Sequence, residues 1–75
     1  MISAVQREIL NRLEEICELS DDIRFGQMVD FMGFLGQDAT NRNLAVIEDE
    51  QFLEILDRHK ADLLRRRDST AELRA

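Results

Sequence analysis

The sequence predicts an all-α fold, a compact domain of three helices. Two observations support this prediction. Hydrophobic residues recur at spacings of three and four in three separate stretches, which is the pattern of helices with a buried face. Residues that cap or electrostatically stabilise helix N-termini also stand at the starts of these stretches. We expect one domain over residues 1–67, followed by a polar tail at 68–75 that has little to bury and frays.

The first predicted helix covers residues 3–19. Ser3 and Gln6 match a capping box, in which each side chain accepts a hydrogen bond from the backbone N–H of the other residue. These two residues therefore mark the start of the helix. Its hydrophobic stripe consists of Val5, Ile9, Leu10, Leu13, Ile16 and Cys17.

The second predicted helix covers residues 23–35. Asp22 is the expected N-cap, since an aspartate side chain accepts hydrogen bonds from the free N–H groups of a helix start. Gly36 is expected just beyond the C-terminus, where a left-handed glycine ends a helix without a steric cost. A polar loop follows, and the short hydrophobic run at 44–47 is consistent with an extended segment packed on the helices.

The third predicted helix covers residues 49–66. Acidic residues crowd its first turn and basic residues lie toward its end, so the side-chain charges complement the helix dipole. Ile47 and Phe52 are spaced to form a hydrophobic staple around the helix start. The charged residues concerned are Glu48, Asp49 and Glu50 at the start, and Arg58, Lys60, Arg65, Arg66 and Arg67 toward the end.

The composition restricts the function classes. With 16 acidic and 10 basic residues, the net charge of -6 argues against nucleic-acid binding as the main activity. The single cysteine, Cys17, forms neither an internal disulfide nor a zinc site by itself. The N-terminus has no signal-peptide pattern, and no stretch approaches the ~20 apolar residues of a membrane span. We therefore expect a cytoplasmic protein without a membrane segment.

The second helix carries more hydrophobic side chains than one stripe requires. Residues 24–36 include three of the 4 phenylalanines of the chain, and roughly two thirds of the helix circumference is apolar. We expect the part around Phe31 and Phe34 to stay exposed in a monomer, unless the other two helices cover it. The predicted interaction residues are Met28, Phe31, Met32, Phe34 and Leu35.

Two further features favour a partner chain. Gly26 and Gly33 lie on nearly the same line of the second helix, which suggests close approach of another helix, from the same chain or from a second copy. A domain of this size also rarely gains more than about 3–5 kcal/mol of net stability from its own core. We expect a homodimer or a complex with another protein.

No residues predict catalysis, cofactor binding or a metal site. His59 is the only histidine and lies in the hydrophobic stripe of the third helix, so we interpret it as a partly buried structural residue. The adjacent acids at 48–50 project in different directions and converge poorly on one metal ion. Neither of the usual glycine-rich phosphate-binding motifs is present, and no small-molecule substrate is evident.

Two alternative functions stay open. The basic end of the third helix, with Arg58, Lys60 and residues 65–67, could contact nucleic acid while the acidic parts face away. An enzyme or metal protein would instead use Glu48, Asp49 and His59.

Arg24 stands at the start of the second helix, where the helix dipole disfavours a cation. We predict a structural ion pair between Arg24 and Glu48 or Asp49, which would offset this cost and connect the starts of two helices.

The segment "DIRFGQMVDF", followed after a loop by "IEDEQFLEIL", resembles a group of small bacterial helical proteins of unknown function. These proteins share a D-x-R-x-G-Q segment followed by an E-D-[ED]-x-[FL]-L helix. The resemblance implies a bacterial cytosolic domain in which Arg24 and the acidic helix start act together. The "DFMGFLG" stretch departs from the group by being more hydrophobic. The matching residues are Asp22, Arg24, Gly26, Gln27, Glu48 and Asp49.

From these observations we predict a non-enzymatic helical interaction module. It self-associates or binds another protein through the Met/Phe face of its second helix, since aromatic and methionine side chains on one helix commonly form such contacts.

Overall fold

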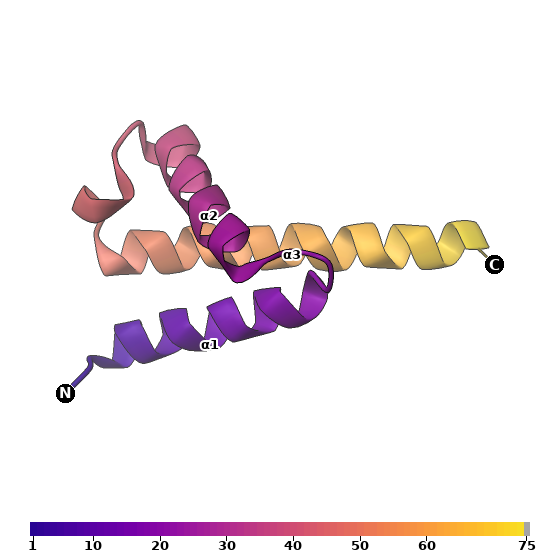
Figure 1. The fold of residues 1–75 in the computed structure, drawn as a ribbon, viewed down its shortest axis with the longest axis horizontal. Helices are drawn as coiled ribbons and strands as arrows, with labels where there is room; N and C mark the ends of the chain where they lie inside the picture. Colours follow the sequence, from indigo (N-terminus) through magenta and orange to yellow (C-terminus); the bar gives the residue numbers. More distant parts are fainter. Residues whose placement is uncertain (75) are drawn as a thin grey trace.

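Three helices and one short turn make up the structure, a computed structural model (Figure 1). It describes the backbone of residues 1–74 and the side chains of residues 1–67. Helix α1 spans Ala4–Leu19, α2 spans Phe25–Thr40, the 3₁₀ turn η1 spans Leu44–Val46, and α3 spans Asp49–Arg74. No strand occurs within residues 1–74, and the predicted all-α fold is confirmed.

Helices α1 and α3 lie side by side and run in the same direction (Figure 1). Helix α2, which lies between them in the sequence, crosses α3 at a steep angle. Two ion pairs between α1 and α3 show how the two parallel helices are aligned. Arg12 pairs with Asp57, which lies 45 residues further along, and Glu15 pairs with Lys60 at the same offset. Helix α1 therefore ends beside the middle of α3, and the C-terminal part of α3 projects beyond it (Figure 1).

The core lies between all three helices. Leu56 of α3 has no exposed surface, and Met28 and Met32 of α2 are each 1% exposed. Cys17 packs against this core with its Sγ atom 3.4 Å from the Sδ atom of Met28, in agreement with its place in the predicted hydrophobic stripe of the first helix. The buried core cluster is completed by Ile9 and Ile16, and the side chains packed around it are Val5, Leu13, Cys17, Leu35, Phe52, Leu53 and Leu63.

The predicted capping box at the start of α1 is present. The backbone N–H of Gln6 donates to Ser3 Oγ at 3.1 Å, and the backbone N–H of Ser3 donates to Gln6 Oε1 at 3.2 Å. Each side chain satisfies an N–H group that has no partner within the helix. This helix start is thus specified by residues that are near neighbours in the sequence.

The predicted ends of α2 were wrong. The N-cap is Arg24 rather than Asp22, and its backbone N–H donates to Gln27 Oε1 at 3.0 Å. The helix also continues through Gly36 to Thr40 and ends at Asn41, which has a left-handed backbone with φ 58°. Asparagine tolerates this conformation better than most residues, so it takes the role that the prediction gave to glycine.

Gly36 has a packing role instead of a conformational one. It is buried inside α2, and a Cβ atom at this position would lie 2.8 Å from Ile47 Cδ1. The missing side chain thus lets the segment after η1 approach α2 closely. A Cβ atom at Gly26 or Gly33 would meet nothing within 4 Å, so the close approach predicted for those two glycines does not occur within the described chain.

The segment at 44–47 is a 3₁₀ turn over most of its length, and the predicted extended conformation holds only for Ile47. Asn43 explains the difference, because its side-chain Oδ1 accepts a hydrogen bond from the N–H of Ala45 at 2.9 Å. Such a local hydrogen bond favours a turn over an extended strand. Ile47 is 8% exposed and Phe52 packs against the core cluster, while the predicted staple contact between these two side chains stays a prediction.

Helix α3 begins as predicted but extends to Arg74 rather than ending near residue 66. Residues 67–74 contain neither glycine nor proline, so no residue in this stretch forces a stop. The tail at 68–75 was predicted to fray, whereas the described backbone of residues 68–74 continues α3. The side chains from residue 68 onward lie outside the described residues.

Candidate interaction surface

The structure divides the predicted interaction residues into two sets. Met28 and Met32 are buried in the core, and Leu35 packs against it, so these three were wrongly assigned to a free surface. The reason is their position on α2, which turns them toward α1 and α3. Phe31 and Phe34 stay exposed at 36% and 61% of their surface, as the sequence predicted.

Phe31 and Phe34 form a stacked aromatic pair on the outside of α2. Their ring centroids are 6.0 Å apart and their planes differ by 15°. Phe31 also contacts His59 of α3 edge to face, with ring centroids 5.2 Å apart. These contacts hold the pair in one orientation, so little side-chain entropy remains to be lost when another molecule covers it.

A shallow hollow of about 470 Å³ borders the pair. Ile23 lies at one end of it, and four residues of α2 form the rest of its lining: Gln27, Asp30, Phe31 and Phe34. The lining therefore combines three hydrophobic side chains with one amide and one carboxylate. A side chain from another molecule would enter between the two aromatic rings and Gln27.

Phe25 and Val29 are also exposed, at 63% and 46%. Phe25 and Phe34 are nine residues apart, which places them about 180° apart around the helix. The sequence analysis did not include this second edge, although the helical spacing could have shown it.

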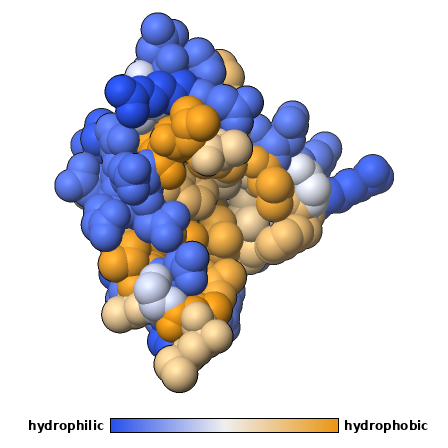
Figure 2. Space-filling model, turned by 90° about the vertical axis from the view of Figure 1, so that its left-hand side faces the viewer, coloured by the Kyte–Doolittle hydropathy of each residue, from blue (hydrophilic) through white to orange (hydrophobic). Residues whose placement is uncertain are grey.

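Figure 2 shows hydrophobic side chains gathered around a hollow on one face of the molecule, with hydrophilic side chains at its border. The remaining exposed large hydrophobic residues are Met1, Ile2, Leu10, Ile23, Val46 and Leu64.

His59 is half-buried, as predicted for a structural residue. Burial lowers the pKa of His59, and the positive charge of Arg66 lowers it further. Both effects favour the neutral imidazole, which packs against Phe31 without carrying a buried charge. His59 thus supports the aromatic pair from the α3 side.

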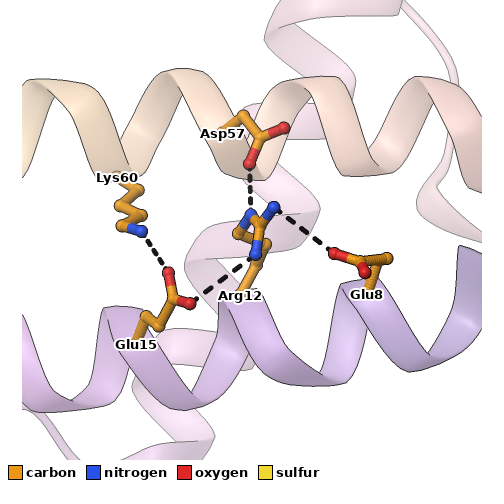
Figure 3. A network of polar contacts seen from close by, with 5 residues as sticks. All are labelled: Glu8, Arg12, Glu15, Asp57 and Lys60. Atoms are coloured by element: carbon orange, nitrogen blue, oxygen red, sulfur yellow. Dashed lines mark hydrogen bonds and ion pairs between the residues drawn. The ribbon is translucent and has the colours of Figure 1, made fainter.

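A charged network connects α1 to α3 (Figure 3). Arg12 lies at its centre, with its Nε 2.5 Å from Asp57 Oδ1 and its other nitrogens 3.4 Å from Glu8 and 3.6 Å from Glu15. Lys60 of α3 pairs with the second oxygen of Glu15. Hydrogen bonding to Asp57 raises the pKa of Arg12, and hydrogen bonding to Lys60 lowers the pKa of Glu15.

The sequence analysis did not predict this charged network. Its pairs between helices are 45 residues apart, and only the parallel arrangement of α1 and α3 brings them together. It fixes α1 against α3 on a polar side and leaves the exposed edges of α2 untouched.

The predicted ion pair of Arg24 with Glu48 or Asp49 is absent from the described residues, where Arg24 takes part in no ion pair. The cause is the direction of α2. Arg24 stands at its start, whereas α3 begins near its end, after η1 (Figure 1). The starts of the two helices therefore lie at opposite ends of α2.

The other candidate residues lie apart from the aromatic pair. Residues 65–67 are exposed on α3, and Arg65 pairs with Asp62. Among the described side chains, no three of His, Cys, Asp and Glu come together as a group that could hold a metal ion. Within residues 1–74, no helix has both the length and the hydrophobicity needed to cross a membrane.

Comparison with known proteins identifies no relative. No protein-family model matches the chain, and neither the curated proteins nor the solved structures contain a match. The resemblance of the D-x-R-x-G-Q segment to small bacterial proteins stays a prediction.

Proposed function

We propose that this protein is a non-enzymatic interaction module that binds a protein partner through the Phe31/Phe34 edge of α2. The observation that supports this most directly is the exposure of Phe34. The chain has only 4 phenylalanines, and Phe34 stays 61% exposed although it stacks on Phe31. Following the resemblance described above, we place this module in the bacterial cytoplasm.

The energetics favour this use of the edge. Burying a fully exposed phenylalanine side chain contributes about 1.5–3 kcal/mol, and aromatic residues commonly dominate the energy of protein interfaces. The contact of Phe31 with His59 orients the pair before binding. A partner would thus gain hydrophobic contact without first ordering these side chains.

The test is chemical cross-linking followed by mass spectrometry, with the intact chain in bacterial extract. We expect cross-links from α2 to a protein, either a second copy or another chain, that disappear in Phe34→Asp. Phe25→Asp is the matched control, because Phe25 has almost the same exposure but lies on the opposite side of α2. Retention of every cross-link in Phe34→Asp would show that this edge is not the binding surface.

A further inference from the structure

We propose that the partner is a second copy of this chain, and that the two α2 helices pair in antiparallel orientation through the Phe31/Phe34 edge. This inference rests on the proposed function and specifies its occupant and geometry. Three observations carry it: the spacing of residues along the edge, the shape of the hollow, and the distribution of charge along α2.

The spacing along the edge is that of a coiled-coil seam. Alternating steps of three and four residues keep side chains on the side that faces a neighbouring helix. Four residues of α2 and its N-cap follow these steps without interruption, and we call them the α2 seam: Arg24 at the N-cap, then Gln27, Phe31, Phe34 and Asp38. Phe31 and Phe34 form its centre, with polar residues on both sides.

The residues that line the hollow have the spacing of those that form a hole in a coiled coil. In such pairs, one side chain inserts between four residues of the facing helix. The α2 residues that line the hollow stand at positions i, i+3, i+4 and i+7, namely 27, 30, 31 and 34. In an antiparallel pair, Phe34 of the second copy enters this hollow and meets Phe31. The two-fold symmetry repeats the contact, so four phenylalanine rings are buried together.

The charges along α2 determine the direction. Arg24 stands at the start of the helix and Asp38 in its last turn, and each has the same sign as the dipole at its end. Asp38 lines a smaller hollow together with Arg58 of α3, yet neither Arg24 nor Asp38 takes part in an ion pair within the described residues. An antiparallel copy brings Arg24 of one chain to the end of the seam that carries Asp38 of the other.

A parallel copy would instead place like charges and like dipole ends beside each other. The unfavourable charges that α2 carries as a single helix thus become favourable in an antiparallel pair, twice per dimer. The contact area is small, because one helix from each copy supplies it. We therefore expect weak association, with the dimer forming only at high protein concentration.

The first experiment measures the solution mass of the full chain by size-exclusion chromatography with light scattering, over a hundredfold range of concentration. We expect a dimer that grows with concentration, is lost in Phe34→Asp and is retained in Phe25→Asp. Circular dichroism of each variant confirms that the helices are intact. A monomer at every concentration, or a dimer that Phe34→Asp leaves unchanged, overturns the inference.

The second experiment reverses the charges. Arg24→Asp and Asp38→Arg should each weaken the dimer by about tenfold, because each creates two like-charge contacts. Both substitutions improve the match between side-chain charge and helix dipole within α2, so unfolding would not explain the loss. The double variant should recover the wild-type affinity. Single variants with wild-type affinity overturn the antiparallel direction.

The failure of this inference differs from the failure of the proposed function. A monomeric chain that still cross-links to another protein, and loses those cross-links in Phe34→Asp, refutes the second copy but keeps the interaction surface. A monomer whose cross-links do not respond to Phe34→Asp refutes both.

Discussion

Replacing Gly36 with alanine tests the close contact between α2 and the segment after η1. Alanine in a helix interior is about 1 kcal/mol more favourable than glycine. At Gly33 the new Cβ atom meets nothing within 4 Å, so Gly33→Ala should increase the free energy of unfolding by this amount. At Gly36 the Cβ atom would lie 2.8 Å from Ile47 Cδ1 and 3.5 Å from Leu44 Cδ1.

Carbon atoms in contact prefer separations of about 3.5–4.0 Å, so Ile47 would have to move by roughly 1 Å. Overpacking of this kind costs about 1–3 kcal/mol, which cancels or exceeds the gain in helix propensity. We therefore expect Gly36→Ala to change the free energy of unfolding by between zero and a loss of about 2 kcal/mol. Gly33→Ala and Gly36→Ala should thus differ by about 1–3 kcal/mol.

Ile47→Val supplies the second half of a double-mutant cycle, because it removes the Cδ1 methyl group that the new Cβ atom would meet. Alone, this substitution should cost about 0.5–1.5 kcal/mol; together with Gly36→Ala it should relieve the overpacking. Urea unfolding followed by far-UV circular dichroism gives the free energies, with all variants in the Phe34→Asp background to exclude self-association. Equal effects of alanine at Gly33 and Gly36, or strictly additive effects of Gly36→Ala and Ile47→Val, would refute the reasoning.

Two further predictions concern charge. Because burial and Arg66 lower the pKa of His59 below its ordinary value of 6.5, the unfolded chain binds this proton more readily, and stability should fall as the pH drops through that value. Unfolding measured between about pH 8 and pH 5.5 should show a weaker slope in His59→Gln, and an unchanged slope would contradict the assignment. Arg12→Ala should destabilise the chain more at low than at high salt, since screening weakens the exposed α1–α3 network. Arg7→Ala, which removes an exposed α1 arginine without an ion pair in the described residues, should show no such salt dependence.

Sequence patterns predicted those structural features correctly whose interacting residues are close together in the sequence. The capping box of Ser3 and Gln6 and the start of α3 were correct, because these features depend on hydrogen bonds and charges within one turn. The exposure of Phe31 and Phe34 was also predicted from the sequence, since the second helix is apolar over more of its circumference than one stripe requires. These features did not require knowledge of how the helices are arranged.

The errors concern residues whose role depends on distant neighbours or on competing local choices. Gly36 was assigned to a helix end, but the helix continues and Ile47 occupies the space that a side chain would fill. Asp22 is a good capping residue, yet Gln27 satisfies the N–H of Arg24 and the helix begins later. Arg24 itself was paired with acidic residues that the path of the chain places at the other end of α2.

By itself the sequence determined the helical content, the first capping box and the excess of hydrophobic surface on α2, because each follows from periodicity and contacts within a few residues. Only the tertiary structure decided which side of α2 became core. It buried Met28 and Met32, left Phe31 and Phe34 at the edge, and joined Arg12 to Asp57 across 45 residues. The reason is that a helical pattern states which side chains share a face, whereas the direction and crossing of the helices decide what each face meets.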